Sequence, residues 1–468
     1  MDITSRIAAA VSACERALET PRGRKAFWVL VAALFLAGGF LAVLRAEFPR
    51  KWLVDNPKYA SPVDMGESKD SQAEWRSSEF RGFRQIGYGV MLEDRDPYII
   101  NADKGLQHIR AYPPFFAMFF FPFALLWKVP GLGSGLFYAI GFGLTLLSAW
   151  YLSRWARKPP DPDDDEPQRD EGFGRFALLF LLLAPLALNV MIRCETDMYI
   201  LFPLALAFYL LVHRRHETLA GALLGIAACI KVLPGLFGVY FIFTRRWRAL
   251  GGMIAVGILC MGILPLLIWG PARCGKLYGS WANVVVGPYF DKGATSFVSG
   301  YRISNQSVTS ALHRWLDQKP LKAGETATGF EAARPTAQTV SRVVKLLQLG
   351  TLLVLIVLWI TRGGRSEPAT IAALLATVPC GILILSEVSL TTHHVTLMLP
   401  MAAVLVRWER FKDDRASRWL WLLPVWLIAL ILSGVAKPVA PLLPTTILFL
   451  IACAALAAGD KAAEREET

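Results

Sequence analysis

Residues 26–44, AFWVLVAALFLAGGFLAVL, form an apolar run without a single charged side chain. A helix needs about 20 apolar residues to cross the hydrocarbon core of a bilayer, so the run predicts a membrane-spanning helix. It is longer than the apolar core of a signal peptide and has no convincing cleavage site, so we do not expect it to be a cleavable signal. The preceding segment 1–25 is predicted to be cytoplasmic because it is rich in basic residues. These are Arg6, Arg16, Arg22, Arg24 and Lys25.

The rest of the chain repeats this apolar pattern. Of its 468 residues 54% are hydrophobic and only 18% are charged, and the mean hydropathy is +0.42. Soluble domains are about 25% charged. Because the apolar residues stand in long blocks, the composition predicts an all-α polytopic membrane protein with about twelve spans. The further spans are predicted at 135–152, 173–190, 197–213, 218–243 (in two pieces), 249–269, 342–361, 368–387, 392–407, 417–433 and 440–458.

The net charge of +12 is interpreted by location. Basic clusters fall in turns that alternate with polar turns lacking them, which predicts that both termini are cytoplasmic. A single transmembrane domain then covers 26–458, with an acidic cytoplasmic loop at 154–172, an external loop at 270–341 and a cytoplasmic tail at 459–468. No basic motif with interleaved aromatic residues is present, so we expect no nucleic-acid partner. The seven cysteines lack the spacing of a metal site.

Residues 46–131 form a large polar insert after the first span and are predicted to be an external catalytic loop. Structureless loops of such length are usually functional or disordered. The apolar segment 114–128 inside the insert is short and interrupted by Pro122. If it crossed the membrane, the alternation of basic turns would fail, so we expect an interfacial or re-entrant helix. A second helix is expected over 79–92.

The other predicted external turns gather ionisable side chains, which at membrane depth indicate function. Lys231 and Pro234 are predicted at a tip between two short helices, where irregular backbone is tolerated beside a cavity. Carboxylates and cations together suit group transfer from a phosphate-linked donor, because cations neutralise the leaving phosphate and a carboxylate accepts a proton. The remaining polar groups in these turns are Arg193, Glu195, Asp197, Arg273, Arg302, Asn305, Gln306, Arg314, His393 and His394.

Four motifs in order along the chain carry a resemblance to a known family. They are Glu79-Phe80 with Asp96-Pro97-Tyr98; Tyr112-Pro113-Pro114-Phe115; Ala220-Gly221, Ala228, Ile230-Lys231, Pro234 and Arg245-Arg246-Trp247; and Asn305-Gln306-Ser307 with Arg314. The third follows an A-G…K-x-x-P…R-R-W pattern and the fourth an N-Q-S…R pattern. In these motifs the chain resembles the polyprenol-phosphate-sugar-dependent glycosyltransferases of family 87, which include mycobacterial mannosyltransferases and arabinofuranosyltransferases.

This resemblance implies a GT-C-type helical bundle in a bacterial plasma membrane, with an outward-facing site. It implies a polyprenyl-phosphate donor carrying a mannose- or arabinofuranose-like sugar, a glycolipid or glycan acceptor, and no resident cofactor. A single displacement predicts inversion at the sugar carbon. The expected catalytic carboxylates are Glu79, Asp94 and Asp96. The expected donor-phosphate ligands are Lys231, Arg302, Arg314, His393 and His394. The expected acceptor contacts are Tyr112, Glu195, Asp197, Asn305 and Gln306.

Two departures from the family pattern leave alternatives open. Glu79 aligns with the usual catalytic Asp, so Asp94 or Asp96 is an alternative base; these two also resemble a DxD site for a divalent metal. The family's G-Q-x-N turn reads C-E-T-D at 194–197. The alternative functions are a transporter or flippase of polyprenyl-linked lipids, and a catalytically inactive binding homologue.

Overall fold

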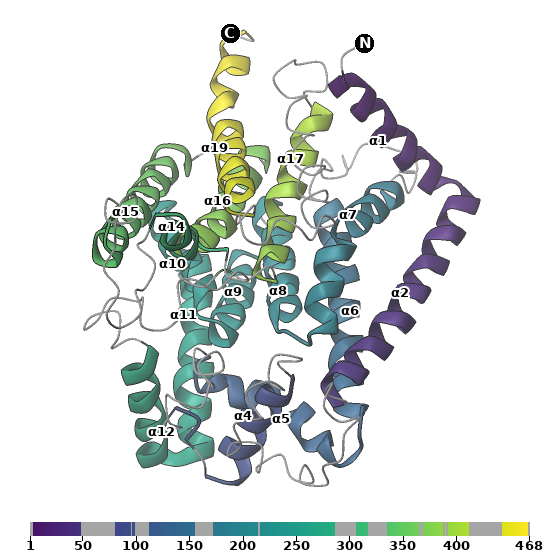
Figure 1. Cartoon of the computed structure of the whole chain (residues 1–468). Coiled ribbons are helices and arrows are strands. Elements are labelled where there is room, and N and C mark those ends of the chain that lie inside the picture. The colour runs from purple at the N-terminus through teal and green to yellow at the C-terminus, as the bar shows by residue number, and fades with distance from the viewer. Residues whose placement is uncertain are drawn as a thin grey trace, which may run out of the picture. The chain divides into compact units, whose positions relative to one another are not determined.

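The computed structural model describes most of the chain (Figure 1). The described residues are 3–47, 80–94, 96–98, 112–154, 172–213, 216–285, 306–316, 335–364, 368–386, 389, 392–410 and 442–466. Within these ranges every regular element is a helix and no strand occurs. The prediction of an all-α protein is therefore confirmed for the described part of the chain.

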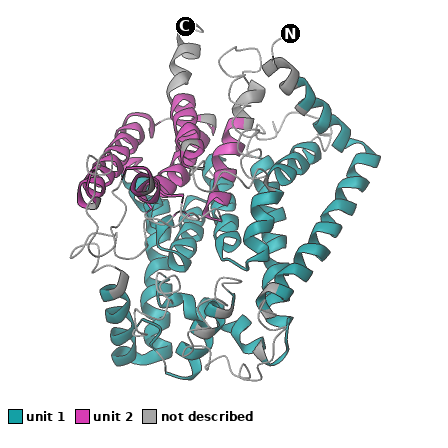
Figure 2. Ribbon diagram, in the orientation of Figure 1, with its two compact units in different colours: residues 1–242, 246–287 teal, residues 243–245, 288–468 magenta. Residues whose placement is uncertain are grey.

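The chain divides into two compact units (Figure 2). Unit 1 comprises residues 1–242 and 246–287, and unit 2 comprises residues 243–245 and 288–468. The helices of unit 1 are α1 (Ile3–Glu19), α2 (Pro21–Glu47), α4 (Phe80–Leu92), α5 (Phe115–Ala124), η6 (Leu125–Lys128), α6 (Leu132–Ser153), α7 (Phe173–Ile192), α8 (Asp197–Val212), α9 (Glu217–Ile230), η7 (Leu233–Gly235), α10 (Leu236–Phe243), α11 (Trp247–Ile258), the π-helical η8 (Leu259–Ile263) and α12 (Leu264–Val285). Those of unit 2 are α14 (Val308–Leu316), α15 (Ala337–Arg362), α16 (Pro368–Leu385), η11 (His393–Leu397), α17 (Met398–Arg410) and α19 (Leu442–Glu466).

Among the described residues, four helical stretches are long and apolar enough to cross a membrane. They are Pro21–Leu44, Leu132–Ser153, Trp247–Asn283 and Gln338–Arg362, and the bent α7 is a fifth if its two pieces are one span. Several other predicted spans are shorter apolar helices, and span 417–433 lies outside the described residues. The chain is thus compatible with a helical membrane protein, and the count of about twelve spans stays a prediction.

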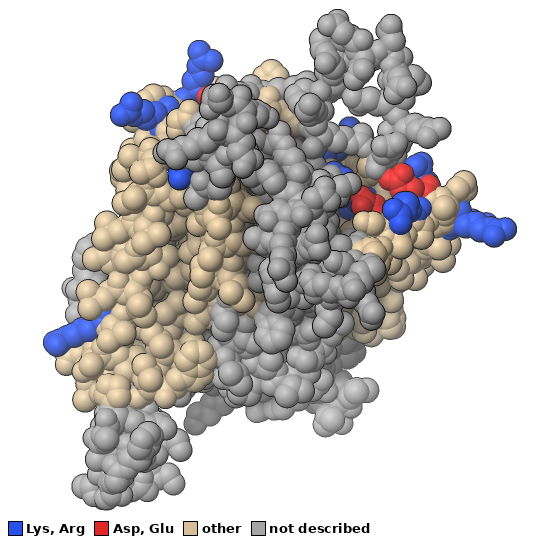
Figure 3. Space-filling view, turned by 90° about the horizontal axis from the view of Figure 1, so that it is seen from above, with Lys and Arg blue, Asp and Glu red and all other residues tan. Residues whose placement is uncertain are grey.

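Apolar side chains on these long helices point away from the rest of the molecule. Leu36 on α2 is 69% exposed, Leu267 on α12 is 76% exposed and Leu346 on α15 is 68% exposed. In Figure 3 the described charged groups gather at a few places, and much of the other described surface is uncharged. Large exposed apolar surfaces of this kind mark a membrane or partner contact, and lipid suits them.

The polar insert contributes the two helices expected from its sequence. The helix predicted over 79–92 is α4, and the short apolar helix inside the insert is α5 followed by η6. Phe83 of α4 packs edge-on against Tyr112, Phe116 and Phe120, with ring centroids 4.9 to 5.4 Å apart. Helix α5 therefore packs closely against α4, as expected of one insert.

The helix pair α9 and α10 is interrupted as the sequence predicts. Helix α9 ends at Ile230, Lys231 is extended (φ −144°, ψ 119°), and Pro234 lies in the short 3-10 helix before α10. Helix α9 is held against α11 through glycines, because a Cβ on Gly221 would overlap the carbonyl oxygen of Ala249. This close approach fixes the element from which Lys231 extends.

Two helical features go beyond the sequence prediction. The span expected to end at 269 does break there, because Gly270 has a φ of 72°, but a second helical piece continues to Val285 inside the predicted loop 270–341. The basic N-terminal segment contains the amphipathic helix α1, which packs on α7. There Glu19 accepts a hydrogen bond from the Gly174 amide at 3.2 Å.

Candidate functional site

The turn between α7 and α8 is the centre of the polar site in unit 1. Helix α7 ends in a Schellman motif, in which the Cys194 amide donates to Met191 and the Glu195 amide donates to Val190. The motif needs a left-handed residue at its corner, and Cys194 takes this conformation with a φ of 53°. The reversal places Glu195, Thr196 and Asp197 in succession at the start of α8.

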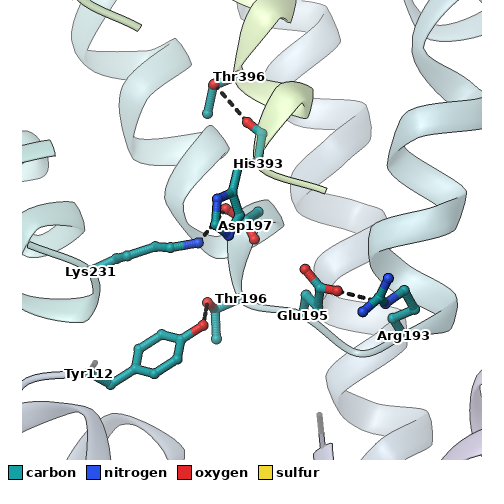
Figure 4. A network of polar contacts seen from close by, with 8 residues as sticks. All are labelled: Tyr112, Arg193, Glu195, Thr196, Asp197, Lys231, His393 and Thr396. Carbon is teal, nitrogen blue, oxygen red and sulfur yellow. Dashed lines mark hydrogen bonds and ion pairs between the residues drawn. The ribbon is translucent and has the colours of Figure 1, made fainter. Parts of the chain in front are cut away.

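Asp197 forms a buried ion pair with Lys231 (Figure 4). The Lys231 Nζ lies 2.9 Å from the Asp197 Oδ1, and the two side chains are 17% and 4% exposed. Asp197 is the first residue of α8 and Lys231 caps the C-terminus of α9, so both helix dipoles favour the charges placed there. The structure thus brings a predicted donor ligand and a predicted acceptor contact together.

Glu195 is paired within its own turn. The Arg193 Nε lies 2.7 Å from the Glu195 Oε1 (Figure 4), and the Glu195 side chain is 2% exposed. Two carboxylates and two cations therefore meet at the turn 193–197. Their formal charges cancel, so the site can be buried without a large net charge.

Tyrosines connect this turn to the polar insert. The Tyr112 hydroxyl lies 3.3 Å from the Thr196 Oγ1 (Figure 4), and the Tyr98 hydroxyl donates to the Tyr112 carbonyl at 2.8 Å. The Tyr98 amide donates to the Asp96 Oδ1 at 2.9 Å. Burial, followed by the nearby Asp96 carboxylate, raises the pKa of Tyr98. The Tyr98 hydroxyl therefore stays protonated and can donate a hydrogen bond in neutral solution. Asp96 stabilises the turn by accepting the hydrogen bond from the Tyr98 amide.

Asp94 faces an arginine that the sequence placed among the polar groups of the external turns without assigning it a role. The Arg273 Nε lies 2.6 Å from the Asp94 Oδ1, and the same guanidinium donates to the Val90 carbonyl at the end of α4. Arg273 extends from α12 just beyond its kink at Gly270. The only signal in the sequence was an arginine in a predicted external loop, and no spacing rule links residues 94 and 273.

The two aspartates of the DxD-like motif have separate partners, Arg273 for Asp94 and the Tyr98 amide for Asp96. Within the described ranges, no three His, Cys, Asp or Glu side chains are grouped so as to hold a metal ion. Asp94 and Asp96 are thus engaged by different partners rather than by one shared site.

Unit 2 carries the predicted site residues from Arg302 onward. His394 on η11 is buried, while the His393 carbonyl accepts a hydrogen bond from the Thr396 hydroxyl at 2.9 Å (Figure 4). Just before α14, the backbone N–H of Gln306 donates a hydrogen bond to the Ser389 carbonyl at 2.7 Å. Glu79, Arg302, Asn305 and the Arg314 side chain lie outside the described residues.

The site in unit 1 places buried ionisable side chains at helix ends of a helical membrane protein, where such groups indicate function. The model of the family described as "Glycosyltransferase family 87" matches residues 111–386. The chain belongs to this family, so the resemblance seen in the sequence motifs is confirmed, and the protein is a membrane glycosyltransferase.

A mycobacterial protein provides a further similarity. The chain is 37% identical over 70 residues to the polyprenol-phosphate-mannose-dependent alpha-(1-2)-phosphatidylinositol pentamannoside mannosyltransferase of Mycolicibacterium smegmatis. The matched stretch covers 15% of this chain and 17% of that protein. No solved structure matches the chain, so the GT-C architecture stays an expectation.

Proposed function

We propose that the protein transfers a mannose- or arabinofuranose-like sugar from a polyprenyl-phosphate donor to a glycolipid or glycan acceptor. The similarity to a mannosyltransferase named as polyprenol-phosphate-mannose-dependent supports this donor class. The reaction takes place at the outer face of a bacterial plasma membrane, with both termini in the cytoplasm, as the distribution of basic turns favours. The observation that carries the proposal is Lys231, a cation at a helix break inside the region that matches the family.

In the proposed reaction an acceptor hydroxyl attacks the anomeric carbon of the donor sugar. The bond from that carbon to the phosphate oxygen breaks, the hydroxyl proton passes to a carboxylate, and polyprenyl phosphate leaves. A single displacement inverts the configuration at the sugar carbon. The phosphate leaves more easily if cations neutralise its growing charge.

Glu79 is the proposed base, and it directly precedes α4 in the sequence. Asp94 and Asp96 are weaker candidates because Arg273 and the Tyr98 amide already engage them. Lys231 is the proposed principal ligand of the donor phosphate. The further proposed ligands are Arg302, Arg314, His393 and His394, and the proposed acceptor contacts are Tyr112, Glu195, Asn305 and Gln306.

The test is sugar transfer by the purified full chain. Labelled polyprenyl-phosphate sugars are incubated with a membrane-lipid extract, and wild type is compared with Glu79→Gln. A positioned base contributes about 10²–10⁴-fold, so we expect Glu79→Gln to lose at least a hundredfold in rate. Glu74→Gln is the matched control, because it removes the same charge from the same insert and should keep its activity.

The result also separates the alternative functions. Turnover that Glu79→Gln leaves unchanged would refute the assignment of the base while retaining the transferase. Movement of polyprenyl-linked lipid across vesicles without any turnover would favour a transporter. Donor binding with neither turnover nor transport would favour a binding homologue.

A further inference from the structure

The ammonium group of Lys231 is already neutralised within the protein. Its partner Asp197 is almost completely buried, and the 2.9 Å separation is that of a charge-assisted hydrogen bond. Removing one member of a buried ion pair leaves an uncompensated charge, so the pair is strongly held when the site is empty. An anion that binds Lys231 therefore approaches the negative charge of Asp197, which opposes its binding.

We propose that Asp197 competes with the donor phosphate for Lys231, and thereby sets the affinity of the site for polyprenyl phosphates. The inference rests on the proposed function, in which Lys231 binds the donor phosphate. Asp197 then tunes donor affinity, although the sequence predicted an acceptor contact at this position. The Asp197 carboxylate is an anion of the protein itself that pairs with Lys231, the cation proposed to bind the donor phosphate.

Competition between Asp197 and the phosphate affects product release as well as donor binding. Loss of the sugar turns the phosphate diester of the donor into a monoester, which carries more negative charge and binds a cation more tightly. Product release limits the turnover of many enzymes. Because Asp197 can pair again with the ammonium group of Lys231, it lowers the affinity of the site for polyprenyl phosphate and increases the dissociation rate of this product.

The test measures binding of farnesyl phosphate, a short polyprenyl monophosphate, to the full-length protein in detergent without acceptor. Asp197→Asn keeps the shape of the side chain and removes its charge. We expect this variant to bind farnesyl phosphate about tenfold more tightly than wild type, a size typical of coupling between two groups. Its dissociation should be slower, while the unliganded protein should melt at a lower temperature because Lys231 has lost its partner.

A double-mutant cycle shows whether the gain acts through Lys231. Lys231→Met should bind the probe at least tenfold more weakly than wild type, and adding Asp197→Asn to Lys231→Met should give no further gain. Glu217→Gln is the matched control for net charge, because it removes a carboxylate from the ion pair with Arg246 at the opposite end of α9. That variant should bind the probe like wild type.

Three outcomes would overturn the inference. If Asp197→Asn binds the probe no more tightly than wild type, the carboxylate only positions Lys231. Equal tightening in Glu217→Gln or in the Lys231→Met background would indicate a general charge effect. If Lys231→Met binds like wild type, the role of Lys231 in the proposed function fails as well. Asp197→Ser, which also removes the charge, repeats the test should Asp197→Asn fold poorly.

Discussion

Cys194 occupies a backbone conformation that glycine adopts without steric cost. Its φ of 53° places the Cβ close to the following carbonyl, which costs roughly 1–2 kcal/mol for a residue with a side chain. The family pattern that the sequence resembles has glycine at this position, and the Schellman corner gives a physical reason for it. The Cys194 side chain is fully buried.

We expect Cys194→Gly to be more stable than Cys194→Ala by about 1 kcal/mol, because both lose the thiol and only glycine relaxes the corner. The measurement is the melting temperature of each purified variant in detergent. Cys453, which is buried inside α19, supplies the opposite case. There the alanine variant should be the more stable by about 1 kcal/mol. The same order at both positions would contradict a left-handed corner at Cys194.

Single residues were predictable where one local pattern governs them. The lysine and proline of the α9–α10 break were foreseen because a basic residue and a helix breaker interrupt an apolar block. The ion pair between Lys231 and Asp197 was not predictable from the sequence. The two residues are 34 positions apart, and no periodicity relates the ends of two helices. The contact of Arg273 with Asp94 was not predicted either. It depends on how α12 lies against the end of α4, which no local pattern indicates.

Helices α9 and α11 cross at a distance that only small residues permit. A Cβ on Gly221 would overlap the carbonyl of Ala249, and one on Gly252 would overlap the carbonyl of Thr218. In both cases the obstacle is helix backbone, which cannot rotate away as a side chain does. The close crossing therefore fixes the position of α9, whose C-terminus carries Lys231.

We expect Gly221→Ala and Gly252→Ala each to destabilise the protein by about 1–3 kcal/mol, because the two helices must move apart. Gly257→Ala on the same α11 is the control, since a Cβ there meets no atom within 4 Å. It should be neutral or slightly stabilising, as alanine favours helix. Thermal unfolding in detergent distinguishes the variants. If Gly221→Ala melts like Gly257→Ala, the crossing is looser than described.

Elements were predictable to the extent that their pattern is local. The amphipathic α4 and the interrupted α5 were expected from the apolar spacing and from Pro122. Helix α1 was not predicted because the segment 1–25 was interpreted only by its basic residues, as a signal of orientation. The helix packs on α7, where Glu19 accepts a hydrogen bond from the Gly174 amide. The second piece of α12 was missed because Gly270 and Pro271 signal the end of a helix, whereas here a new helical piece starts directly after them.

At the level of the whole chain, the proposed orientation in the membrane rests on the distribution of basic turns. The cysteines offer a direct measurement, because Cys14 on α1 is exposed and the other six are buried. We expect a membrane-impermeant maleimide to label Cys14 only after the cells are lysed. Gln318→Cys in a Cys14→Ser background should be labelled in intact cells, because 270–341 is predicted to be external. Labelling of Cys14 in intact cells would reverse the proposed orientation.

The bond between the Tyr98 hydroxyl and the Tyr112 carbonyl ties together two points 14 residues apart in the chain. Insertions or deletions between these points leave both anchors in place, so α4 and α5 need not adjust. Doubling the length of such a loop costs only about 0.6 kcal/mol of closure entropy. The chain between Tyr98 and Tyr112 can therefore be lengthened or shortened at small cost, while the bond between the two tyrosines stays in place.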